Sequence, residues 1–125
     1  MIIESLTLNN FGTYKGRQFF DLVPEDEKKP IILIGALNGS GKTTFLNSIQ
    51  LCLYGNNAPQ VKLSKMSYSD YLKNKINRSV DKQEGASIRV NLIIEENSES
   101  ETLSIERRWA ENENGKIKEK VLILR

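Results

Sequence analysis

Histidine is absent from this sequence, and cysteine occurs once, as Cys52. These shortages exclude a disulfide framework, a zinc site built from cysteine and histidine, and a histidine-based catalytic triad. The sequence also contains no apolar run of about 18 residues, the length needed to span a bilayer. Its first ten residues, MIIESLTLNN, lack the basic start and apolar core of a secretory signal. We therefore expect a cytoplasmic protein with no membrane partner.

An excess of charge of either sign is missing as well. The 125 residues have a net charge of +2, with 38% hydrophobic and 27% charged residues, which is typical of one soluble domain with a modest core. The charge is uneven, because residues 61–92 hold seven basic and three acidic side chains. Such a segment can face phosphates, but a solvated helix face is the simpler interpretation.

Periodicity predicts a domain of mixed α/β class. Strands are expected in IESLTLNNF, around Gln18–Leu22, and in the apolar run IILIG at residues 31–35, whose continuous apolarity suggests a strand buried on both faces. Helical spacing follows Gly41 and ends near Tyr54, and a helix that is apolar nearly all round should be buried. GNNAPQ is expected to form a loop. A second helical face is formed by Tyr68, Tyr71, Leu72, Ile76 and Val80.

The last forty residues alternate between apolar and polar positions. ASIRVNLIIEE, TLSIERRWA and KIKEKVLILR are separated by the polar turns NSES and ENENG, a pattern that predicts an antiparallel meander. The sequence stops within the third of these strand patterns, so we expect a piece of a longer protein.

The stretch IILIGALNGSGKTTFLNSIQ at residues 31–50 carries the clearest chemistry. It runs from an apolar strand through a glycine-rich turn into a helix, which is the arrangement that holds a triphosphate on backbone N–H groups at a helix N-terminus. Lys42 is the predicted catalytic residue, because its ammonium group would reach the β- and γ-phosphates. The Thr43 hydroxyl would bind Mg²⁺, and Thr44 would contact the α-phosphate. The full set of predicted ATP-binding residues is Asn38, Gly39, Ser40, Gly41, Lys42, Thr43 and Thr44.

One position departs from the phosphate-loop pattern G-x-x-x-x-G-K-[ST]. Ala36 stands where the first glycine is expected, and Gly35 lies one residue early. That glycine mainly serves the turn out of the strand, so alanine is tolerable there if its φ is negative, and the phosphate-facing Gly39 and Gly41 are intact. The alternative is a strand–helix turn that binds nothing, which the order of strand, loop, Lys-Thr-Thr and helix disfavours.

The residues needed for hydrolysis are harder to find. An acidic residue at the end of an apolar strand should hold Mg²⁺, and a further group should orient the attacking water. Glu95 and Glu96, after NLII, are the candidates, but their segment alternates and runs into a hairpin turn, which favours a meander strand. No SGG signature follows residue 44. Whether the chain is itself an enzyme is therefore left open.

The segments LTLNNFGTYKG and PIILIGALNGSGKTTFLNSIQLCLYG together resemble the N-terminal head segment of the coiled-coil chromosome and DNA-repair ATPases, the SMC branch of the ABC ATPases. The later segments LYG, YLKNKINR, EGAS and RRW resemble DndD, the family of DNA sulfur-modification (phosphorothioation) proteins. The likeness extends over essentially all 125 residues.

The resemblance implies an α/β P-loop NTPase lobe of the ABC/SMC-head type, with a mixed sheet, a buried P-loop helix and flanking antiparallel strands. Within residues 1–125, it implies a P-loop core at 1–60, a helical insert at 61–85 and the meander at 86–125. ATP and Mg²⁺ would bind at Asn38 to Thr44. Tyr14 and Arg17 fall where such heads approach the nucleotide, although a solvated hairpin explains them equally well.

The family also implies partners. A C-terminal lobe, a second head, DNA and other DNA-modification proteins would complete the machine, and hydrolysis would need the missing lobe. Three alternatives remain. The first is a head fragment of another DNA-repair or restriction SMC-type ATPase, and the second is a small stand-alone P-loop NTPase or kinase that uses Glu95 or Glu96. The third is a module with a vestigial loop that binds no nucleotide.

Overall fold

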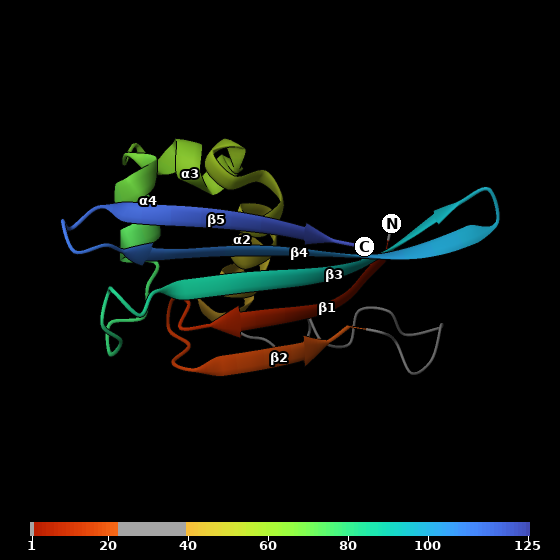
Figure 1. The fold of residues 1–125 in the computed structure, drawn as a ribbon, viewed down its shortest axis with the longest axis horizontal. Helices are drawn as coiled ribbons and strands as arrows, with labels where there is room; N and C mark the ends of the chain where they lie inside the picture. The colour runs from red at the N-terminus through yellow and green to blue at the C-terminus, as the bar shows by residue number, and fades with distance from the viewer. Residues whose placement is uncertain (1, 23–39) are drawn as a thin grey trace.

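The computed structural model describes residues 2–22 and 40–125. Its centre is a five-stranded sheet in the order β2-β1-β3-β4-β5, and every pair of neighbouring strands is antiparallel. Figure 1 shows the helices gathered on one face of this sheet. The strands are β1 (Ile2–Asn9), β2 (Arg17–Asp21), β3 (Ala86–Glu96), β4 (Glu99–Glu111) and β5 (Ile117–Leu124). The helices are α2 (Ser40–Tyr54), a 3-10 turn (Gly55–Asn57), α3 (Pro59–Ser64) and α4 (Tyr68–Asn74).

Alternation decides which face of each strand meets the helices. Successive side chains on a strand point to opposite faces, so β3 buries Ala86, Ile88, Val90 and Leu92 and leaves the residues between them more exposed. Leu6 and Leu8 of β1 are fully buried on the same face. The other face carries polar residues and is covered by no helix of the described chain (Figure 1).

Trp109 of β4 lies at the centre of the core and is 2% exposed. Its indole Nε1 donates a 2.7 Å hydrogen bond to the carbonyl oxygen of Leu72 near the end of α4. Its ring meets Phe11 edge to face, with 6.0 Å between ring centroids. A buried indole needs an acceptor for its N–H, so this bond fixes α4 against the sheet. Packing thus accounts for Trp109, as the strand pattern predicts.

The α/β fold and the flanking antiparallel strands predicted from the sequence are confirmed. β3, β4 and β5 form the predicted meander, and Asn97 and Ser98, with φ of 52° and 69°, make the two-residue turn between β3 and β4. The predicted strand at 31–35, which would bring parallel pairing to the sheet, lies outside the described residues. In the described part of the chain, all pairing is antiparallel.

Three local predictions differ from the structure. The helix expected over Tyr68–Val80 ends at Asn74, because Asn77 turns the chain: its side chain accepts from the Ser79 amide and donates to the Gly12 carbonyl. Part of the expected loop GNNAPQ is helical, since Pro59 occupies the first position of α3. The third is the prediction that the helix after Gly41 is buried nearly all round. Among the described residues, α2 is buried on one side only, and Leu46 is 43% exposed.

None of the helices in the described part of the chain is both long enough and apolar enough to cross a lipid bilayer. The longest of them, α2, has 15 residues.

Gly85, directly before β3, provides a test of how closely the chain packs against Trp109 of β4. A Cβ atom at Gly85 would lie 2.2 Å from the Trp109 carbonyl oxygen, and the residue has a φ of +77°. Gly115 has nearly the same φ, +76°, but a Cβ there would meet nothing nearer than 4.0 Å. A positive φ alone costs about 1–2 kcal/mol. We therefore expect Gly85→Ala to lower the free energy of unfolding by at least about 2 kcal/mol more than Gly115→Ala does.

Denaturant unfolding of the two variants beside the unmodified chain measures this difference. Equal losses at Gly85 and Gly115 would contradict the close approach of the chain to Trp109.

Candidate functional site

The predicted phosphate-binding residues meet the described structure at the start of α2. The helix begins at Ser40, so Ser40 to Thr44 form its first turn, while Asn38 and Gly39 lie outside the described residues. The first N–H groups of a helix have no partner within it and carry a partial positive charge. No acidic residue stands in the first turn of α2, and Thr43 is exposed. This end of the helix therefore fits a polyphosphate, with Thr43 accessible to a bound Mg²⁺.

The turn between β1 and β2, residues 10–16, lies beside this end of α2. A Cβ atom at Gly12, where φ is +59°, would be 3.4 Å from the Thr44 methyl group. Tyr14 meets Phe20 edge to face, with centroids 6.1 Å apart, and Phe20 meets Phe45 of α2 in the same way at 5.5 Å. The aromatic series fixes the hairpin against the first half of α2. Tyr14 therefore packs on the α2 side of the sheet, and its approach to a nucleotide stays a prediction.

Two asparagines, which the sequence analysis did not single out, hold this turn. Asn10 has a φ of +54°, accepts a 2.8 Å bond from the Gly16 amide and donates a 3.3 Å bond to the Gly85 carbonyl. Asn77 donates a 3.0 Å bond from its side chain to the Gly12 carbonyl, and its amide donates to Asn10. Asparagine tolerates a positive φ and bonds nearby backbone, so the pair Asn9-Asn10 before Phe11-Gly12 was the available signal.

Arg17 lies elsewhere. It pairs with Asn9 at the end of β1 and lines a depression with Thr7, Ser87 and Arg89 on the helix-free face of the sheet. Arg17 belongs to the edge strand β2 and shares a face of the sheet with Thr7 and Arg89, on the side opposite to the helices. Whether Arg17 approaches a nucleotide stays a prediction, because most of the loop before α2 lies outside the described residues.

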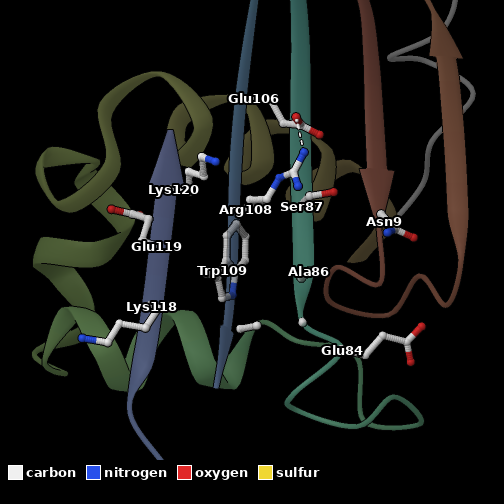
Figure 2. Close-up of a pocket in the computed structure, with 12 residues that line it drawn as sticks. Asn9, Glu84, Ala86, Ser87, Glu106, Arg108, Trp109, Lys118, Glu119 and Lys120 are labelled. Atoms are coloured by element: carbon white, nitrogen blue, oxygen red, sulfur yellow. Dashed lines mark hydrogen bonds and ion pairs between the residues drawn. The ribbon is translucent and has the colours of Figure 1, made fainter. Parts of the chain in front are cut away.

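The helix-free face carries a row of polar and basic residues across all five strands. Strand register places Arg17, Asn9, Ser87, Arg108 and Lys120 directly beside one another on β2, β1, β3, β4 and β5. We call these five residues the basic row. With strands about 4.8 Å apart, it spans about 19 Å. Figure 2 shows Arg108 and Lys120 on neighbouring strands above a hollow that Lys118 also lines.

Glu106 neutralises part of this face. Its Oε2 atom lies 3.0 Å from Arg108 Nη2 and 3.4 Å from Arg89 Nη2, and Figure 2 draws the first of these contacts. Burial raises the pKa of Glu106, but the hydrogen bond and charge of Arg108, with Arg89 beside it, outweigh burial and hold that pKa below its ordinary value. The Arg89 Nε atom is buried without a hydrogen-bond partner among the described residues.

The basic stretch noted in the sequence does not form one surface. Lys62 belongs to α3, and Lys73 of α4 pairs with Glu111 at 2.9 Å, so both lie in the helical layer. Lys75 lies over the Tyr71 ring, 5.2 Å from its centroid. Only Arg89 of β3 reaches the helix-free face. The segment is divided because the chain crosses from the helical layer to the sheet between residues 75 and 86.

Glu95 and Glu96 are far from the start of α2. They end β3 at the β3–β4 hairpin, are exposed and pair with Ser100 and Glu99. The turn at 10–16 lies at the other end of the sheet, where Asn9 pairs with Ser87. Eight residues of strand separate Ser87 from Glu95, about 26 Å at 3.3 Å per residue. The structure therefore does not bring these carboxylates together with Thr43. Within the described residues, no group of three acidic, histidine or cysteine side chains could hold a metal ion.

A family model described as an AAA domain matches residues 5–124. The chain belongs to this AAA domain family. The match confirms the predicted fold of an α/β P-loop NTPase lobe, and members of such ATPase families use nucleotide. The first turn of α2 is the part of this AAA domain's described structure that fits that use.

Two relatives place the family match in context. The chain is 34% identical over 124 residues to the "DNA double-strand break repair Rad50 ATPase" of Nanoarchaeum equitans (strain Kin4-M), which is 99% of this chain and 13% of that protein. It therefore spans about an eighth of the length of this relative. The "SMC head domain from Thermotoga maritima" aligns with 100% of the chain and 39% of its own, at 16% identity and a TM-score of 0.47.

Proposed function

We propose that this chain is the nucleotide-binding N-terminal lobe of an SMC-like ATPase head that works on DNA. The observation that carries this proposal is the start of α2 at the sequence Ser-Gly-Lys-Thr-Thr, with no acidic residue in its first turn and the 10–16 turn beside Thr44. The AAA domain match and the Rad50 relative support it. The cytosolic machine itself would include a C-terminal lobe and a second head.

In this proposal the chain's own residues bind and orient the nucleotide. Backbone N–H groups of Asn38 to Gly41 surround the β-phosphate, Lys42 neutralises the β- and γ-phosphates, and Thr44 contacts the α-phosphate. Thr43 holds Mg²⁺, which screens the charge of the phosphates when it is bound. Hydrolysis depends on acidic residues of the second lobe, since Glu95 and Glu96 lie at the end of the sheet opposite to the 10–16 turn, about 26 Å from Ser87 along β3.

The biological setting proposed here is DNA sulfur modification. This proposal rests on the DndD-like segments EGAS and RRW, which the structure accounts for by packing: Gly85 lies against Trp109, and Arg107 and Trp109 are buried. Such residues indicate shared descent and carry no sulfur chemistry of their own. A DNA-repair ATPase of the Rad50 type, which the relative's name favours, fits the same site equally well and is the second candidate.

The basic row supports contact between this lobe and DNA. Phosphate contacts by lysine and arginine supply most sequence-independent affinity for DNA. Arg17, Arg108 and Lys120 stand about one strand spacing or more apart along a face that no described helix covers. The row would follow a phosphate backbone without reading its bases.

We expect this chain to bind Mg²⁺-ATP with no measurable steady-state turnover, and Lys42→Ala to weaken binding at least about tenfold, because a charged hydrogen-bond donor to phosphate is lost. Calorimetric titration and a phosphate-release assay on a folded sample measure the two properties. Cells whose full-length protein carries Lys42→Ala should lack phosphorothioate linkages in their DNA.

Three outcomes discriminate among the alternatives. Lysine-dependent turnover by the chain alone would show a stand-alone NTPase and contradict the half-head. No nucleotide binding would show a vestigial loop. Intact phosphorothioate linkages in Lys42→Ala cells, together with sensitivity to double-strand breaks, would favour the DNA-repair candidate.

Arg108→Gln and Lys120→Gln should each weaken binding of duplex DNA several-fold, whatever its sequence. Each should also reduce the slope of log K against log salt concentration by about 0.9, the value for one lost phosphate contact. Lys62→Gln is the matched control, because Lys62 is exposed on α3 in the helical layer. Fluorescence anisotropy at several salt concentrations measures both quantities.

A duplex affinity that does not depend on salt, or one that Lys62→Gln lowers as much as the row variants do, would contradict DNA binding at the basic row.

A further inference from the structure

The end of α2 opposite its phosphate-binding turn is held by an arginine from another element. The last four carbonyl groups of a helix lack partners within it, and a cation is favourable there. α2 has no basic residue in its last turn. Arg107 of β4 donates to the Cys52 carbonyl from Nε at 3.3 Å and from Nη2 at 3.2 Å. β4 therefore supplies the charge that the helix's own sequence lacks.

Two further side chains fix this arginine. Its Nη1 atom lies 3.0 Å from Glu119 Oε2 on β5. The same carboxylate oxygen accepts a hydrogen bond from the Tyr68 hydroxyl at the start of α4. Burial, then the hydrogen bond and charge of Glu119, raises the pKa of Tyr68, which keeps its hydroxyl protonated. We call Arg107, Glu119 and Tyr68 the α2 clamp.

The chain that leaves α2 passes close to the clamp. A Cβ atom at Gly55 would lie 3.0 Å from Arg107 Nη1 and 3.1 Å from its Cζ. One turn earlier, the Cys52 thiol donates to the carbonyls of Ile105 at 3.4 Å and Ile88 at 3.6 Å. The end of α2 is thus tied to β3 and β4 by its side chain and to Arg107 by its backbone.

Burying these charges costs free energy, so the stability of the fold alone does not explain why the pair is present. Arg107 is 9% exposed, and the Glu119 side chain is 25% exposed. Replacing a buried ion pair by packed apolar residues is often neutral or stabilising. Leu103, Ile105 and Trp109 show that this face of β4 accepts apolar side chains elsewhere. An arginine here provides geometry, because its fork contacts a carbonyl and a carboxylate together.

A rigid helix transmits that geometry to its other end. α2 has 15 residues, about 21 Å at 1.5 Å per residue. Its first half is held by Thr44 beside Gly12 and by Phe45 against Phe20. Because the helix is rigid, a displacement of α2 by about 1 Å along its axis moves Cys52 and Thr43 by the same distance. A misplacement of about 1 Å can cost an enzyme about 100-fold in rate, so a displacement of this size at Thr43 should also weaken its contact with Mg²⁺.

We propose that Arg107, Glu119 and Tyr68 are positioning residues that set the position of α2 along its axis and thereby the placement of Thr43 for Mg²⁺ and of the helix N-terminus for phosphate. This inference rests on the proposed function, since it concerns the same nucleotide. The three residues act from the far end of the helix and do not contact the ligand.

The test compares ATP affinity with and without Mg²⁺. The ratio of the ATP Kd in EDTA to the Kd in Mg²⁺ reports how well Thr43 is placed, and a smaller folded fraction leaves this ratio unchanged. Arg107→Lys keeps the charge but loses the fork, and Glu119→Gln keeps the shape but loses the charge. We expect Arg107→Lys to lower the ratio about fivefold to tenfold, and Glu119→Gln to lower it by less.

Glu111→Gln is the matched control. Glu111 also lies on β4 and pairs with Lys73 of α4 at 2.9 Å, so its loss breaks another ion pair of β4, away from the end of α2. The ratio for this variant should stay within twofold of the unmodified chain. If Arg107→Lys does not fold, Glu119→Gln carries the test.

The outcomes separate the two proposals. In one outcome, the unmodified chain binds Mg²⁺-ATP, while Arg107→Lys and Glu119→Gln lower the melting temperature but keep the same ratio of ATP Kd values. That result would overturn the positioning role and leave the proposed function standing. Unmodified chain that binds no ATP would overturn both.

Discussion

The hydrogen bond from the Trp109 indole to the Leu72 carbonyl joins the sheet, α4 and the turn at 10–16 in one place. Phe11 of that turn packs on the indole ring, and Gly85 passes against the Trp109 carbonyl. Loss of a buried tryptophan costs about 3–5 kcal/mol, a large part of the stability of a small domain. The turn that approaches Thr44 is therefore positioned by this corner of the core, several residues away from any phosphate.

The β4–β5 ladder has different chemistry on its two faces. Arg107 and Glu119 point toward the helical layer and hold the end of α2, while Arg108 and Lys120, one residue further along each strand, belong to the basic row. This separation follows from the two-residue period of a strand. The same short stretch of sheet thus lies between the helix that would hold ATP and the face that would meet DNA.

The strands and α2 could be predicted because their patterns are local. Alternation in ASIRVNLIIEE predicts β3, and helical spacing after Gly41 predicts α2, each from about a dozen residues. The end of α4 could not be predicted in this way, because Ile76 and Val80 keep a helical spacing while Asn77 bonds to Gly12, 65 residues earlier in the chain. α3 had a local signal in Pro59 that the loop-forming residues around it concealed.

The residues of the candidate site also differ in whether a local pattern predicts them. The motif Gly-Lys-Thr-Thr by itself predicts the start of α2, and the helix begins there. Arg107 carries no such motif: it occupies an inward position of a strand, where an apolar residue is expected, and its contacts with the Cys52 carbonyl and Glu119 explain it. The glutamates at 95 and 96 were weak candidates because a strand pattern does not tell which end of the sheet they reach.

Amide hydrogen exchange of this chain with and without Mg²⁺-ATP shows where the nucleotide binds. We expect the nucleotide to slow exchange most strongly at residues 39–44 and next at the turn 10–16, with the β3–β4 hairpin tip unchanged. Protection at the tip or on the helix-free face, with none at the start of α2, would contradict the claim that this helix N-terminus is the nucleotide site.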